Sequence, residues 1–174
     1  MGKRSDFERH ERDLYLTPVE AVLPLKRFVR PGSRFWEPCA AGGGLARALV
    51  EQTGLECIGM SDIVPLHPSV ERYDLFQIAT GATADQFITN PPWERKILHR
   101  IIDHLKWILP TWLLLDADWL FNKSSAEYLP DATDIVAIGR VKWVPDSEHT
   151  GKENACWVRF VGGHDRGATF HPNW

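Results

Sequence analysis

The stretch Arg34-Phe-Trp-Glu-Pro-Cys39, followed by Ala-Ala-Gly-Gly-Gly at 40–44, decides the fold class. Its first part predicts a short buried strand, because bulky apolar residues precede a run of small ones. Residues 45–52 then have helical spacing. Glycines between a strand and a helix permit positive φ angles and let a ligand approach the backbone closely. Because the stretch lacks the GxGxxG pattern, a tight turn without a ligand explains it nearly as well.

The same alternation of strands and helices extends along most of the chain. Upstream, TPVEAVLPLKRFV at 17–29 predicts an amphipathic helix with a bend near Pro24. Another helix is expected at 95–108, where apolar residues recur at helical spacing. This spacing predicts an α/β, Rossmann-like three-layer sandwich, whose mainly parallel seven-stranded sheet ends in an antiparallel hairpin. The further strands are predicted at 56–62, 73–76, 86–89, 111–120, 134–144 and 154–161.

Composition limits the classes of protein that the chain can represent. Its 174 residues are 44% hydrophobic and 25% charged, which is typical of one globular domain. We expect a flexible arm at 1–13 and a single domain at 14–174. The net charge of -3 creates no overall positive field toward nucleic acid or a membrane. Three widely separated cysteines and the lack of a signal peptide or long apolar run predict a cytoplasmic protein without membrane contact.

Acidic side chains follow several of the predicted strands. Ligands of open parallel sheets bind beyond the carboxyl ends of the strands, so the loops after Cys39, Asp62, Phe76 and Thr89 should lie together. Asp62 could accept hydrogen bonds from two ribose hydroxyls, although a helix cap or a turn explains this residue equally well. Asp74 could accept one from an adenine amino group, with an apolar neighbour packed on the ring.

The sharpest motif is Asn90-Pro91-Pro92-Trp93, directly after the predicted strand at 86–89. Two prolines fix φ and keep the preceding residue extended, so the Asn90 side chain and the Pro91 carbonyl are held rigidly. An amine conjugated to a ring is a poor nucleophile, because its lone pair is delocalised. Two oxygen acceptors that take its protons would turn the lone pair toward an electrophile. Trp93 could provide a platform for a planar substrate.

Five segments, taken in this order, resemble class I S-adenosylmethionine-dependent methyltransferases. More narrowly, they resemble amino-methylating enzymes with an (N/D)PP(Y/F/W) motif, notably adenine-N6 DNA methyltransferases and their small phage or prophage relatives. The likeness covers about residues 14–161. The segments are TPVEAV (17–22), EPCAAGGGL (37–45), SDI (61–63), YDLF (73–76) and ITNPPW (88–93).

The resemblance implies a role for each motif. Thr17 would contact the methionine carboxylate of S-adenosylmethionine, Asp62 the ribose, and Asp74 the adenine. Asn90 and the Pro91 carbonyl would grip the target amino group, which attacks the sulfonium methyl group directly without a metal. The implied catalytic residues are Asn90, Pro91, Pro92 and Trp93, and the implied cofactor-binding residues are Thr17, Glu37, Pro38, Cys39, Ala40, Ala41, Gly42, Asp62, Ile63, Asp74, Leu75 and Phe76.

The implied substrate is a nucleobase amino group, most specifically adenine N6 in DNA. Larger family members carry a separate target-recognition domain, for which this chain has no room, so a homodimer or a partner protein could supply recognition. Phosphate contacts would come from Arg95, Lys96, Arg100, Lys123 or the late loop. The alternatives are methylation of a protein glutamine amide, methylation of an RNA base, and a noncatalytic cofactor-binding subunit.

Several other polar residues are open to two interpretations. Asp116 and Asp118 suggest a metal pair, but hydrogen-bonded acids at a strand end explain them better. His164 and His171 lie in a tail that we expect to be disordered or loosely docked. The loop His149 to Lys152 is either an exposed hairpin tip or a lid whose lysine reaches a phosphate. Trp119 or Trp143 could line the substrate cleft beside Trp93.

Overall fold

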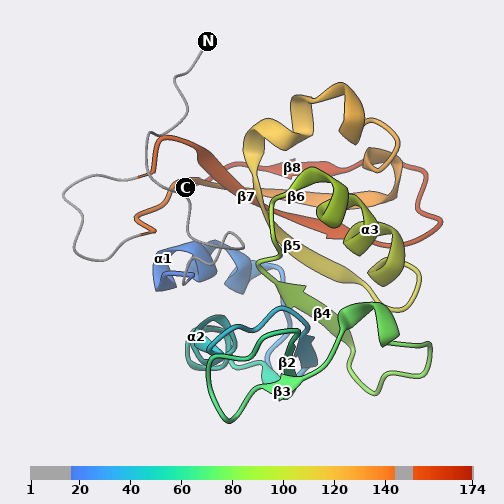
Figure 1. Ribbon diagram of the computed structural model, residues 1–174. Coiled ribbons are helices and arrows are strands. Elements are labelled where there is room, and N and C mark those ends of the chain that lie inside the picture. The colour runs from blue at the N-terminus through green and yellow to red at the C-terminus, as the bar shows by residue number, and fades with distance from the viewer. Residues whose placement is uncertain (1–16, 144–150, 174) are drawn as a thin grey trace.

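The computed structural model describes residues 17–143 and 151–173 as one twisted sheet with helices on both faces (Figure 1). The predicted three-layer architecture is confirmed. The strands are β1 (Arg34–Glu37), β2 (Glu56–Asp62), β3 (Glu71–Arg72), β4 (Gln86–Thr89), β5 (Thr111–Asp116), β6 (Ala132–Arg140), β7 (Asn154–Phe160) and β8 (Thr169–His171). The α-helices are α1 (Val19–Val22), α2 (Gly44–Thr53) and α3 (Arg95–Leu105), and the 3-10 helices are η2 (Leu23–Arg27), η3 (Leu75–Gln77), η4 (Ala117–Phe121), η5 (Lys123–Ser125) and η6 (Leu129–Asp131).

The strand order is β3-β2-β1-β4-β5-β7-β6-β8. Strands β1 to β5 are parallel to one another, and β7 lies antiparallel between β5 and β6. Because β6 is antiparallel to β7, it runs in the same direction as β5. The carboxyl ends of β1, β2, β4, β5 and β6 therefore meet at one edge of the sheet.

Several details of the sheet differ from the sequence prediction. The strand predicted at 111–120 ends at Asp116, after which η4 begins. The sheet has eight strands rather than seven, because β8, from the tail predicted to be disordered or loosely docked, pairs with β6. The prediction of a strand at 73–76 is wrong. The strand lies just before it, at Glu71–Arg72, and η3 begins at Leu75, with the Asp74 side chain accepting from Phe76 N at 3.0 Å. A side-chain cap favours a turn over an extended chain at this point.

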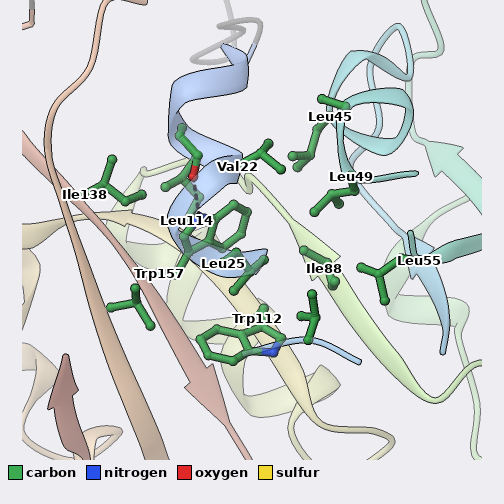
Figure 2. Close-up of a cluster of buried hydrophobic side chains, with 14 of the residues drawn as sticks. Val22, Leu25, Leu45, Leu49, Leu55, Ile88, Trp112, Leu114, Ile138 and Trp157 are labelled. Carbon is green, nitrogen blue, oxygen red and sulfur yellow. Dashed lines mark hydrogen bonds between the residues drawn. The ribbon is translucent and has the colours of Figure 1, made fainter. Parts of the chain in front are cut away.

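One hydrophobic cluster fills the space between the sheet and α1, η2 and α2 (Figure 2). Val22 of α1 and Leu49 of α2 pack toward Leu114 and Trp157 of the strands. Each buried side chain of this kind contributes about 1.5–3 kcal/mol to folding. The Trp157 indole also donates a hydrogen bond to the Ala21 carbonyl at 2.7 Å. Together these contacts fix α1, and the residues just before it, against the sheet.

A second cluster lies on the opposite face, between the sheet and α3. Leu98, Ile101, Ile102 and Leu105 form the buried stripe of this helix, as their spacing predicts. Glu94 begins the helix by accepting hydrogen bonds from the Lys96 and Ile97 amides, at 3.1 Å each. The NPPW motif therefore sits between a buried strand and a firmly capped helix.

Two predicted segments lie wholly or partly outside the described residues. They are the arm at 1–13 and the loop His149 to Lys152, of which Gly151 and Lys152 are described. Gly151 donates its amide hydrogen to the Val141 carbonyl at 2.8 Å, so the chain re-enters beside the end of β6. No helix within 17–143 or 151–173 has the length and apolar character needed to cross a membrane.

Candidate functional site

The glycine loop between β1 and α2 is shaped by its own backbone. Gly43 N donates to the Ala40 carbonyl at 2.6 Å, and Ala40 N donates to Ser61 O at 2.9 Å. Ala41 has a φ of 48°, which is unusual for a residue with a Cβ. Gly43 has a φ of 73°, and a Cβ there would lie 3.0 Å from the Met60 sulfur. By contrast, a Cβ at Gly42 would meet no atom within 4 Å, so open space adjoins the loop.

Glu37 caps α2 from the end of β1. Its Oε2 accepts a hydrogen bond from the Ala46 amide at 2.9 Å, in the first turn of a helix whose own cap residue has no side chain. The side chain is buried, and burial raises the pKa of Glu37 to about 8, although the bond from Ala46 opposes the shift. The structure thus gives Glu37 a backbone partner as well as a place beside the loop.

Asp62 holds the glycine loop from the end of β2. Its two carboxylate oxygens accept hydrogen bonds from the Ala41 and Val64 amides, each at 2.8 Å. A carboxylate offers about four acceptor positions, so two stay available to a ligand. The neighbouring Ile63 is 62% exposed and presents an apolar surface beside this acid.

In the predicted cofactor segment at 74–76, one residue caps a 3-10 helix and its neighbours pack into the core. Asp74 uses Oδ1 to cap η3, while Leu75 is buried in the second cluster. The Phe76 ring faces α3, because the Arg100 guanidinium lies 4.3 Å from its centroid and the His104 ring meets it edge-on. Cys39 packs against the same cluster, so the structure brings Cys39, Leu75 and Phe76 to one face of the sheet.

Asn90 is oriented by a residue far away in the sequence. Its Nδ2 donates a hydrogen bond to Thr17 Oγ1 at 3.2 Å, across 73 positions of the chain. This bond uses one of the two Nδ2 hydrogens and orients the amide, whose Oδ1 atom is its acceptor. The following Pro91 is buried and Pro92 is half-buried, so the turn after β4 is anchored in the protein. No pattern in the sequence indicates the contact with Thr17.

The Trp93 side chain is held in place by a hydrogen bond and by a ring contact. Its indole donates to the Leu114 carbonyl at 2.9 Å, and its ring meets Trp143 edge-on, with centroids 5.5 Å apart and planes at 85°. Trp143, which follows β6, is therefore the one of the two tryptophans considered that lies beside Trp93. Trp119 instead is buried in the second cluster and donates to His99 at 3.1 Å.

The glycine loop and the NPPW motif meet at Thr89 and Cys39. The Thr89 hydroxyl is fully buried beside the Cys39 thiol, but it makes no hydrogen bond of standard geometry within the described residues. Burial raises the pKa of the Cys39 thiol far above its usual value, and it raises that of Cys156 to about 12. Both thiols stay protonated near neutral pH, so neither provides a thiolate nucleophile.

The residues considered for metal binding have other partners. Asp116 accepts from the Asp118 amide at 3.0 Å and begins η4, so the two acids do not share a strand. His171 pairs with Asp134 at 2.9 Å between β8 and β6, and His164 contacts the Gly167 carbonyl. Within 17–143 and 151–173, no group of three or more His, Cys, Asp or Glu side chains could hold a metal ion.

Comparison of this fold with solved structures finds methyltransferases. A type I restriction-modification methyltransferase subunit from Streptococcus thermophilus matches 91% of this chain and 47% of its own, with a TM-score of 0.56 and 10% identity. A Listeria monocytogenes protein described as a class I S-adenosylmethionine-dependent methyltransferase matches 90% of this chain and 65% of its own, with a TM-score of 0.57 and 9% identity. The m1A22 tRNA methyltransferase of Bacillus subtilis matches 84% and 68%, with a TM-score of 0.53 and 15% identity.

The chain therefore has the Rossmann-like fold of class I S-adenosylmethionine-dependent methyltransferases. Those relatives include methyltransferases of type I restriction-modification systems, of which this chain spans about half the length. No protein-family model matches the sequence, and no curated protein does either.

Proposed function

We propose that the protein is an S-adenosylmethionine-dependent methyltransferase that acts on the exocyclic amino group of a nucleobase, specifically adenine N6 in DNA. The observation that carries this proposal is the fixed amide of Asn90 at the carboxyl end of β4. Its nitrogen is held by Thr17, so its oxygen is the atom that meets the substrate. The type I methyltransferase subunits among the structural relatives support a DNA substrate.

The glycine loop fits the methionine part of the cofactor. Open space adjoins Gly42, the backbone at Ala41 and Gly43 has positive φ angles, and Asp62 retains acceptor positions for ribose hydroxyls. Glu37 and the loop Pro38–Gly42 would surround the methionine part, and Ile63, Asp74, Leu75 and Phe76 the adenosine. When bound, the cofactor supplies a methyl carbon activated by the positive sulfur.

The chain itself prepares the amino group. The Asn90 oxygen and the Pro91 carbonyl accept the two amino protons, which removes the lone pair from conjugation and points it away from the acceptors. Prolines 91 and 92 keep these acceptors from moving during the reaction. Trp93 presents the exposed part of its ring to the base, while Leu114 and Trp143 hold that ring in place.

The test is transfer of label from methyl-labelled S-adenosylmethionine to mixed acceptors. The full chain is incubated with single-stranded DNA, RNA and a glutamine-containing peptide, and the products are identified by mass spectrometry. We expect N6-methyladenine in DNA. Label on the glutamine amide or on RNA alone would assign one of the two other acceptors. Donor binding, measured by calorimetry, without any transfer would identify a noncatalytic subunit.

A further inference from the structure

A cavity of about 390 Å³ lies between η2 and the β6–β8 end of the sheet, and we call it the η2–β6 groove. Its floor is apolar, with Phe28, Ile138 and Val141 among the lining residues. Arg27 and Arg140 stand on its walls, together with the single acid Glu20. A volume of this size is within the range of sites that bind small molecules or single nucleotides.

Hydrogen bonds hold the walls of the groove in place. Glu20 accepts a bond from the Lys142 amide at 3.1 Å, which ties α1 to the segment after β6. At the other end, Asn173 donates to the Ile138 carbonyl at 2.6 Å. A β-bulge at Gly139, with a φ of 91°, lies directly before Arg140. Bulges redirect the side chains that follow them, so the arginine is placed by the strand itself.

The charges of the groove favour an anion. Arg27 and Arg140 are exposed, and neither side chain forms a hydrogen bond or ion pair within the part of the chain that the structure describes. Glu20 opposes them, but one of its oxygens is already bound to the Lys142 amide. The guanidinium group matches a phosphate with two parallel donors.

Short segments of the chain connect the groove with the proposed acceptor site. Glu20 is three residues after Thr17, which holds Asn90, and Arg140 is three residues before Trp143, which contacts Trp93. In the strand order, β4 stands between β1, which leads into the glycine loop, and β6. A chain of nucleotides in the groove would thus reach Asn90 from the side opposite the methyl donor.

The cations near α3 are a weaker alternative for phosphate binding. Arg95 and Lys96 directly follow Glu94, and the Arg100 guanidinium lies over the Phe76 ring. The neighbouring η4 and the segment after η5 add Asp118 and Glu127. Nearby acids therefore offset part of the positive charge on this side, and the Arg100 guanidinium already contacts an aromatic ring.

We propose that the η2–β6 groove binds the segment of the DNA strand next to the target base, with backbone phosphates on Arg27 and Arg140. The apolar floor takes the face of the adjacent sugar and base. This inference rests on the proposed function, because it names how that site holds its substrate. It also assigns substrate binding to the catalytic domain itself, where the sequence showed no strong basic patch.

The test compares two double variants, Arg27→Gln with Arg140→Gln, and Arg95→Gln with Lys96→Gln. Binding of a single-stranded, adenine-containing oligodeoxynucleotide is measured by fluorescence anisotropy at several salt concentrations. The measured quantity is the slope of log Kd against log salt concentration. Each phosphate contact to a single strand contributes about 0.7 to this slope, so loss of two contacts should lower it by about 1.4. We expect this change in the groove variant and not in the α3 variant, with the affinity for S-adenosylmethionine unchanged in both.

An unchanged slope in the groove variant would overturn the inference, while labelled transfer to DNA by the wild type would leave the proposed function standing. A lower slope in the α3 variant alone would overturn it as well. If the wild-type chain binds no oligodeoxynucleotide and labels only protein or RNA, the inference fails together with the proposed function.

Discussion

The two halves of the carboxyl edge are held together in different ways. At β1 and β2, acids bind backbone amides. The partners are two residues apart for Asp62 and Val64, nine for Glu37 and Ala46, and 21 for Asp62 and Ala41. At β4 to β6, an amide and an indole are held by a hydroxyl and by a strand carbonyl. Asn90 contacts Thr17 across 73 positions, and the Trp93 indole is bound by the Leu114 carbonyl.

This difference separates a preformed backbone loop from an assembled side-chain site. The glycine loop keeps its shape through its backbone, which has positive φ angles at Ala41 and Gly43 and donates a hydrogen bond to Asp62. The side chains of the acceptor half reach their observed positions only when α1, β4, β5 and the segment after β6 are packed together. We therefore expect substitutions in the two halves to affect different measured quantities.

The largest expected effect is that of Asn90→Ala, which breaks the acceptor half without touching the glycine loop. Loss of one oriented acceptor should lower kcat by about 10²–10³-fold, as is typical of removing one such group from an active site. The Kd for S-adenosylmethionine, measured by calorimetry, should stay at the wild-type value. Single-turnover transfer to DNA gives the rate of the chemical step.

Two outcomes would count against this separation. Undiminished transfer by Asn90→Ala would remove the residue from the mechanism. Equal losses of donor affinity and of rate would mean that the two halves behave as one coupled unit rather than as a loop and a separate acceptor site.

The next effect is on stability and concerns the backbone-held half. The pKa of Glu37 is about 8 in the folded chain, against a usual value of 4.5. Between these values the folded state keeps a proton that the unfolded state has released. The folded state thus binds more protons, and the free energy of unfolding falls as the pH rises, by on the order of 1 kcal/mol per pH unit.

The variant Glu37→Gln sharpens this prediction, because it keeps an oxygen for the Ala46 amide but cannot ionise. Urea unfolding at a series of pH values between 4.5 and about 8 should show the wild type losing stability relative to the variant. Parallel curves for the two proteins would show that Glu37 is already ionised in the fold, as a helix-capping carboxylate in contact with water would be.

The fold was largely predictable, because it follows from periodicity. The apolar run at 111–115 and the helical stripe of α3 place their elements directly. The errors fall on short segments, whose structure a single interaction can decide. The Asp74 cap changes a predicted strand into a turn, and the pairing of Thr169–His171 with β6 depends on a neighbour that sequence pattern does not identify.

The candidate site was predictable motif by motif but not as an assembly. Rigid NPPW and the glycine loop have local signatures, and the fold brings both to one edge. The partners of Asn90 and Trp93 have none, since a threonine before a helix and a carbonyl within a strand are common everywhere. The same holds for the η2–β6 groove, which forms only when η2 meets β6 and β8.

The smallest expected effect tests Thr17 and so the central difference between the halves. Thr17→Val keeps the shape of the side chain but removes the acceptor for Asn90 Nδ2. Loss of one hydrogen bond that orients a reacting group should reduce kcat by about 10-fold, or about 1.4 kcal/mol. Thr17→Ser retains the hydroxyl and should recover most of the rate. An orienting role changes kcat and leaves the donor Kd alone, whereas contact with the methionine carboxylate would raise that Kd. A higher Kd for S-adenosylmethionine with a normal kcat would therefore assign Thr17 to donor binding. In that case the neighbouring prolines alone would orient Asn90.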